Sequence, residues 1–266
     1  MNRLLLINVI CLTIFCSCVN YETKLKVNKD GSGTIVETLL MNKFLIKQMD
    51  FISSMDKKNK KKKNFYEMMS DKAILKKRAK KMGKDVQFVK VLKKEKNGQM
   101  GLTTYFTFSD INNVSLSLGG QKHIILSSIN KANKTIEESD GLIKFLFNKS
   151  KESRLEIFLP KQQKKVAKNK EESVSVEQIE MIKATMKDAR LAFIIEVNGK
   201  IIKTNSTVYN DNSVTPIKLN FLKIVSDEAL LKKIFSNNFD FQQLKKMTKK
   251  IPGVIIEEKE KIFIVF

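Results

Sequence analysis

The sequence predicts an α+β fold in which antiparallel β-hairpins pack against several amphipathic helices. Two features of the pattern predict it. Runs of alternating apolar and polar residues, typical of strands, flank Asp-Gly and Asn-Gly turns. Between them lie segments whose apolar residues recur every three or four positions, as in amphipathic helices. The chain has 266 residues, of which 42% are hydrophobic, enough to bury a substantial core.

The first 18 residues are typical of an export signal. Arg3 precedes an apolar run that extends from Leu4 to Phe15, and Cys16-Ser17-Cys18 follows. The run has the length of a signal-peptide core and is shorter than the roughly 20 apolar residues of a membrane-spanning helix. We therefore expect residues 1–17 to be removed as a signal peptide and residues 18–266 to form the exported domain.

Cys18 is the candidate for lipid attachment, because the small Ser17 and the compact Cys16 precede it. Phe15 stands where a lipoprotein signal usually has Leu, and ordinary cleavage around Cys16 to Cys18 is the alternative. The third cysteine, Cys11, also lies in the signal, so the exported domain has no disulfide and must depend on its core. An unmodified Cys18 would be an exposed reactive thiol, which favours lipidation and a membrane anchor.

The first half of the exported chain predicts two hairpins and two helices. The elements are strands 21–27 and 34–40 around Asp30-Gly31, helix 42–55, helix 65–82 ended by Gly83, and strands 86–91 and 102–108 around Asn97-Gly98. Asn-Gly between alternating runs is the strongest short-range hairpin signal. Further strands are expected at 123–128, 142–147 and 155–159. The segment 142–147 is apolar on both sides and fits a short buried helix equally well.

A polar, Lys-rich stretch at residues 161–172 predicts a linker or an exposed loop. It separates two candidate lobes, residues 19–160 and 173–266. The second half predicts a helix that begins at Ser175, a hairpin of strands 191–197 and 201–208 around Asn198-Gly199, a strand 217–225, helices 226–235 and 240–249, and two final strands, 254–257 and 262–266.

The formal net charge of +22 would fit a nucleic-acid partner. Only four of the fifty basic residues are arginines, however, although base and phosphate recognition favours the guanidinium group. An exported protein is also separated from the DNA of its cell. We therefore expect no nucleic-acid partner. One block of like charge remains as a possible anion-binding site, with a solvated loop as the other interpretation: Lys57, Lys58, Lys60, Lys61, Lys62 and Lys63.

The sequence predicts no catalytic residue, cofactor or metal site. His123 is the single histidine and has no Cys, Asp or Glu at the spacing of metal ligands, so we interpret it as a strand-surface residue. Gly31-Ser32-Gly33 lacks the strand, loop and helix context of a phosphate-binding loop, and we interpret it as a turn.

Two segments carry a resemblance to a known group of proteins. They are Lys29-Asp30-Gly31-Ser32-Gly33-Thr34, shortly after the signal cysteine, and the Phe-Ile-Ile-Glu-Val-Asn-Gly-Lys-Ile stretch at residues 193–201 with the nearby Thr204-Asn205. In these segments the chain resembles a family of bacterial lipoproteins of the spirochaete type, whose function is uncharacterised. The resemblance implies export and an α+β domain, and it carries over no catalytic residue.

The resulting expectation is an envelope lipoprotein, anchored to a membrane through Cys18, with a non-catalytic binding or structural domain and no cofactor. The first alternative is a Lys-rich surface adhesin that binds anionic host polymers or host proteins. The second is a hydrolase whose paired carboxylates lie apart in the sequence. The expected location is the bacterial cell envelope, with the face of the membrane left open.

Overall fold

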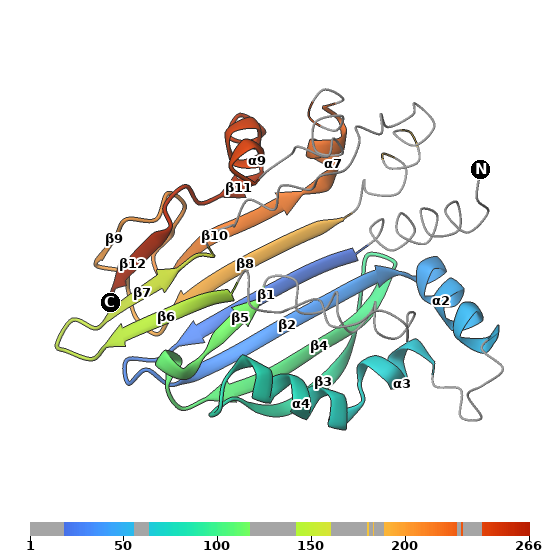
Figure 1. The fold of residues 1–266 in the computed structure, drawn as a ribbon, viewed down its shortest axis with the longest axis horizontal. Coiled ribbons are helices and arrows are strands. Elements are labelled where there is room, and N and C mark those ends of the chain that lie inside the picture. The colour runs from blue at the N-terminus through green and yellow to red at the C-terminus, as the bar shows by residue number, and fades with distance from the viewer. Residues whose placement is uncertain are drawn as a thin grey trace, which may run out of the picture.

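The computed structural model of the chain describes residues 19–55, 64–117, 142–160, 180, 183, 189–227, 230 and 241–266. Their strands form two sheets (Figure 1). The seven-stranded sheet has the order β11 (Ile255–Ile256), β10 (Ser213–Asn220), β8 (Arg190–Val197), β1 (Val19–Val27), β2 (Gly33–Asn42), β4 (Gln99–Phe108) and β3 (Gln87–Lys96). The five-stranded sheet has the order β5 (Ser115–Ser117), β6 (Leu142–Asn148), β7 (Arg154–Phe158), β12 (Lys261–Val265) and β9 (Lys203–Thr204).

The predicted α+β class is wrong, because the described residues form a mostly β fold. The helices whose bounds the structure describes are α2 (Lys43–Met55), α3 (Phe65–Met69), α4 (Lys72–Met82), α7 (Phe221–Val225), α9 (Phe241–Thr248) and the short 3₁₀ helix η1 (Ile111–Asn113). The main partner of the large sheet is the second sheet. Local periodicity predicts that an element buries one face, but it does not say whether a helix or a sheet will cover that face.

Two hairpins lie where the sequence predicts them. β1 and β2 pair from Val19↔Met41 to Val27↔Gly33, around the Asp30-Gly31 turn. β3 and β4 pair around Asn97-Gly98, both of which have positive φ, as a tight hairpin turn between twisted strands requires. Segment 142–147 is strand β6, which excludes its reading as a buried helix, and segment 155–159 is confirmed as β7.

The predicted hairpin of strands 191–197 and 201–208 is wrong. β8 pairs in parallel with β1 and antiparallel with β10, which begins at Ser213. After Asn198 the chain leaves the large sheet, and β9 pairs with β12 in the other sheet. Asn198 N–H donates to Val27 O, a contact with β1 that local sequence does not reveal.

The boundaries of one predicted helix and of one predicted strand also differ in the structure. The helix expected at 65–82 is divided between α3 and α4, because the Asp71 side chain accepts from Ala73 N–H and Ile74 N–H and starts a new helix. The strand expected at 217–225 ends at Asn220, where α7 begins. α2, α9, β11 and β12 lie in the segments predicted for them. The strand at 123–128 and the loop at 161–172 are outside the described residues, as are most of the helices predicted after Ser175 and Ser226.

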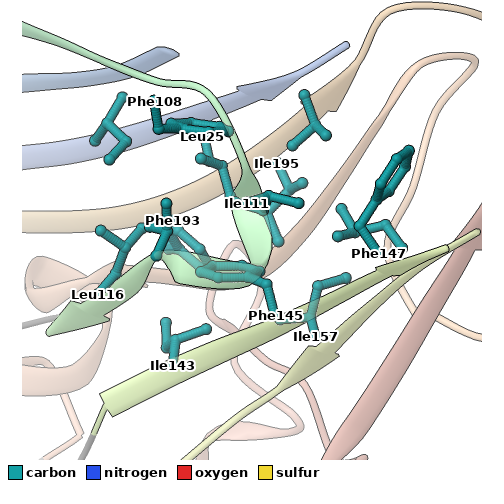
Figure 2. Packing of buried hydrophobic residues seen from close by; sticks show 14 of the residues in the cluster. Leu25, Phe108, Ile111, Leu116, Ile143, Phe145, Phe147, Ile157, Phe193 and Ile195 are labelled. Carbon is teal, nitrogen blue, oxygen red and sulfur yellow. The ribbon is translucent and has the colours of Figure 1, made fainter. Parts of the chain in front are cut away.

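One face of the large sheet is covered by the second sheet and by helices. In Figure 2, Phe193 and Ile195 of β8 lie on one side of a core to which Phe145 and Ile157 of the second sheet contribute. This core is the larger of two hydrophobic clusters, and it also contains Leu75, Ala79 and Met82 of α4. A smaller cluster lies on the same face toward the start of β1 and contains Tyr21, Leu39, Met41, Leu45, Ile46, Phe65, Met69 and Leu102.

Both sheets contain strands from each side of residues 161–172. β8 pairs with β1, and β12 pairs with β7. Among the described residues, no helix is both long enough and apolar enough to span a membrane.

Candidate functional site

The site residues that the sequence predicts lie outside the part of the chain that the structure describes. This applies to Cys18 and to the block Lys57, Lys58, Lys60, Lys61, Lys62 and Lys63, and His123, interpreted as a strand-surface residue, lies outside that part as well. Within the described ranges, no group of three or more His, Cys, Asp and Glu side chains is placed to hold a metal ion. Three other features of the described residues are candidates: a buried charged cluster, a set of linked turns and a lysine-rich surface.

The buried charged cluster joins α4 to the large sheet. Arg78 of α4 donates through Nη2 to Glu37 Oε1 of β2 over 2.6 Å, and Tyr21 of β1 donates to the same oxygen over 2.8 Å. Glu37 is 2% exposed, and Tyr21 and Arg78 are each 8% exposed. Among the described residues, Glu37 Oε2 and Arg78 Nη1 are buried without a hydrogen-bond partner.

The charges of this cluster control its protonation. Burial and, next, the charge of Glu37 raise the pKa of Tyr21 well above its ordinary value, so the phenol stays protonated and donates. Burial alone would lower the pKa of Arg78, but the charge of Glu37 and the hydrogen bonds to Tyr21 and Glu37 outweigh burial and raise it. The cluster is therefore an ion pair with a neutral phenol, closed off from solvent.

The cluster is not among the predicted sites, although the sequence contains a signal for it. Glu37 lies between Ile35 and Leu39, on the buried phase of its strand, and Arg78 lies on the helix face of Leu75 and Ala79. A charge at a position where the period requires an apolar residue indicates a buried pair. We interpret the pair as a structural connection, because side chains buried to this degree cannot reach a ligand on the surface.

The segments that carry the resemblance to lipoproteins meet at the end of the large sheet where β1 finishes. In the β1–β2 turn, the Asp30 carboxylate accepts from Ser32 N–H and Ser32 Oγ. Gly31 has φ +86°, and a Cβ there would lie 2.8 Å from the Phe147 ring. Gly31 O accepts from Ile111 N–H, so this turn is packed against η1 and β6.

Asn198 and Asn205 connect the same region to the rest of the chain. Asn198 N–H donates to Val27 O at the base of the turn. The Asn205 side chain accepts from Phe263 N–H and donates to Lys261 O, so it extends the pairing of β9 with β12. These contacts give the polar residues of both segments a structural role.

Glu257 is a second buried carboxylate, and neutral groups satisfy it. Only 1% of the residue is exposed, and it accepts from Ser206 Oγ, Thr207 N–H, Thr207 Oγ1, Glu258 N–H and Lys259 N–H. Burial alone would raise the pKa of Glu257, but these donors, with Thr207 first, outweigh burial and lower it. The carboxylate therefore stays ionised and joins the segment after β9 to the segment before β12.

The lysine-rich surface is formed by α4 and β3, which lie side by side (Figure 1). Lys72, Lys76, Lys77 and Lys80 are exposed on α4, opposite its buried face. On β3, the exposed Lys93 pairs with the buried Leu102 and lies on the face that α4 covers, whereas the exposed Lys90, Lys94 and Lys96 lie on the opposite face of the sheet. The amphipathic period of residues 72–82 places these α4 lysines on one face, a signal weaker than the denser lysine block at 57–63 from which an anion-binding site was predicted.

Comparisons with known proteins add little to this picture. No family model matches the chain, and no curated protein matches it. Among solved structures, the NMR structure of the folded domain of the Mycobacterium tuberculosis protein LppM aligns with 77% of this chain and 83% of its own, at 10% sequence identity and a TM-score of 0.29. A score this low does not establish a shared fold.

Proposed function

We propose that this chain is a bacterial envelope lipoprotein of the spirochaete type, held at a membrane by acyl chains on Cys18. One observation carries the proposal: β1 begins at Val19, directly after the cysteine at which the export signal ends. The signal and the folded domain therefore meet without a gap, as expected if processing exposes Cys18 as the first residue of the mature domain.

The proposed role of the domain is binding or structural support without catalysis. Three carboxylates are buried among the described residues, Glu37, Glu156 and Glu257, and each has a hydrogen-bond or ion-pair partner from another segment. The polar residues of the β1–β2 turn, of Asn198 and of Asn205 are likewise engaged in contacts between segments. These contacts support a rigid module better than they support a reactive centre.

Metabolic labelling with palmitate tests the anchor. Wild type should incorporate label, a Cys18→Ala variant should lose it, and a Cys16→Ala variant should keep it as the matched control. Equal labelling of wild type and the Cys18→Ala variant would refute the proposed attachment site.

The lysine-rich surface of α4 and β3 supports a second candidate function, the binding of anionic host polymers by a surface adhesin. Such binding depends on screened charge and should weaken steeply as salt rises. The triple variant Lys76→Gln, Lys77→Gln, Lys80→Gln should elute from heparin at lower salt than wild type. The triple variant Lys149→Gln, Lys151→Gln, Lys200→Gln removes the same charge from exposed loops and is the control. Equal elution of both variants would show that net charge, and not this surface, governs binding.

A further inference from the structure

We propose that the end of the large sheet at which β1 begins rests on the bilayer surface, with apolar side chains of α2 and α7 inserted into the interface. This inference rests on the proposed anchor at Cys18. It adds an orientation of the domain and a second, non-covalent contact with the membrane.

The strand register brings α2 and α7 to the end where the anchor would lie. Val19 pairs with Met41, and α2 begins at Lys43, two residues later. On the other side of β1, Asn20 pairs with Arg190, which pairs with Asn220, and α7 begins at the next residue. Both helices therefore leave the large sheet at the end where β1 enters it (Figure 1).

α2 exposes an aromatic face at this end. Leu45 and Ile46 are buried in the smaller cluster, while Phe44 is 67% exposed and Phe51 is 60% exposed. Residues seven apart in a helix lie on nearly the same side, and Lys47 lies between the two phenylalanines on that side. An exposed Phe-Lys-Phe face fits an interfacial helix, in which aromatic rings enter the bilayer and the lysine reaches the headgroups.

α7 adds a second apolar contact beside cationic groups. Leu222 is 43% exposed and Lys223 is exposed next to it. Arg190 and Lys43 are also exposed at this end, with Lys43 paired to Glu95. Cations around exposed apolar side chains are complementary to a surface that contains anionic lipid headgroups.

The absence of a spacer between Cys18 and β1 decides in favour of the bilayer as the partner of this surface. Consecutive Cα atoms lie about 3.8 Å apart, so acyl chains on Cys18 would hold Val19 within a few ångströms of the headgroups. A domain tethered so closely cannot turn this end away from the membrane. The neighbouring apolar side chains would then meet the bilayer before they meet any other partner.

Tryptophan reporters test the orientation, because the chain contains no Trp of its own. Three full-length lipidated variants, each with one Trp, are reconstituted into phosphatidylcholine–phosphatidylglycerol vesicles with or without brominated acyl chains. Phe44→Trp and Leu222→Trp report from the proposed contact. Tyr209→Trp is the control: Tyr209 is 61% exposed and bridges to Val214 near the start of β10, at the opposite end of the sheet.

Binding to vesicles should shift the Phe44→Trp and Leu222→Trp emission to shorter wavelength, and brominated acyl chains should quench it. Neither effect should be seen for Tyr209→Trp. Co-flotation with vesicles is measured on the same samples, and thermal unfolding checks that each variant folds. Co-flotation without quenching at Phe44→Trp and Leu222→Trp would overturn the orientation and leave the anchor standing. Failure of the lipidated chain to float with vesicles would overturn the proposed anchor and the orientation together.

Discussion

The larger and the smaller hydrophobic cluster lie on the same face of the large sheet but are covered differently. A second sheet closes the larger one, and Phe106, Phe193 and Ile157 are each fully buried there. The smaller one lies under α2 and α3, and α2 leaves Phe44 and Phe51 exposed above it. The larger cluster is enclosed between two sheets, which favours stability. The thinner cover of the smaller cluster leaves apolar side chains exposed for contact with a partner.

The two ends of the large sheet therefore have different roles. The linked turns at the finish of β1 hold both sheets together through Gly31, Asn198 and their partners. The opposite end, where β1 begins, carries the proposed membrane contact. The buried pair of Glu37 and Arg78 lies between the two clusters, since its strand neighbours Ile35 and Leu39 belong to different ones.

Breaking the buried pair should have the largest effect. Glu37→Gln leaves the Arg78 guanidinium buried without its counter-charge, and we expect a loss of about 3–5 kcal/mol in the free energy of unfolding. Urea denaturation measures it. Replacing both partners together, Glu37→Met with Arg78→Met, should recover most of the loss, because two uncharged side chains need no counter-charge.

The control for this variant is Glu196→Gln on the other face of the sheet. The Glu196 carboxylate forms salt bridges with Lys24 Nζ at 2.7 Å and with Lys26 Nζ at 3.2 Å, and all three side chains are partly exposed. Its loss should cost about 0.2–1 kcal/mol and should vanish in high salt. Similar costs for Glu37→Gln and Glu196→Gln would contradict the distinction between a buried and an exposed pair.

A matched pair of glycine variants compares the two ends directly. Gly31 and Gly98 both have positive φ, so an alanine at either site should cost about 1–2 kcal/mol in backbone strain. A Cβ at Gly31 also meets the Phe147 ring, whereas a Cβ at Gly98 meets nothing within 4 Å. Gly31→Ala should therefore be less stable than Gly98→Ala by about 1–3 kcal/mol, the usual cost of overpacking. Equal melting curves would mean that the ring moves aside freely.

Acid should lower the free energy of unfolding through protonation of Glu257. Its folded pKa lies below the ordinary carboxyl value of about 4.3, so its stabilising contribution is complete above that pH and is lost as pH falls through the lower folded value. Glu257→Gln should cost about 1–3 kcal/mol at neutral pH, because donors lose a charged acceptor. The variant should also lose less stability than wild type between neutral pH and pH 3. Parallel pH–stability curves would contradict this assignment.

The smallest effect on folding is expected at the exposed end. Phe44→Ser should change the free energy of unfolding by less than about 0.5 kcal/mol, because the ring is already in solvent. Urea denaturation of the unlipidated domain measures it, with Phe106→Ala as the buried comparison at about 3–5 kcal/mol. A large loss in Phe44→Ser would assign this ring to the folded core and remove it from the proposed membrane contact.

Sequence patterns predicted elements well where local chemistry decides. Asn97-Gly98 predicted its hairpin because few other residue pairs adopt two positive φ angles at low cost. The same dipeptide type at Asn198-Gly199 was misleading, since a contact of Asn198 with β1 directs the chain into another sheet. The alternation of apolar and polar residues shows which residues of a strand face a core. It does not show which strand pairs with it, because the same alternation suits any partner strand.

The sequence by itself determined the hairpins of β1–β2 and β3–β4 and the apolar faces that form the core, and the export signal with Cys18 is a prediction from the sequence alone. Only the tertiary structure decided that a second sheet covers the first, that Glu37 meets Arg78, and that α2 and α7 emerge beside Val19. The reason is physical: turns and periodicity act over a few residues, whereas layer packing and charge pairing join residues far apart in the chain.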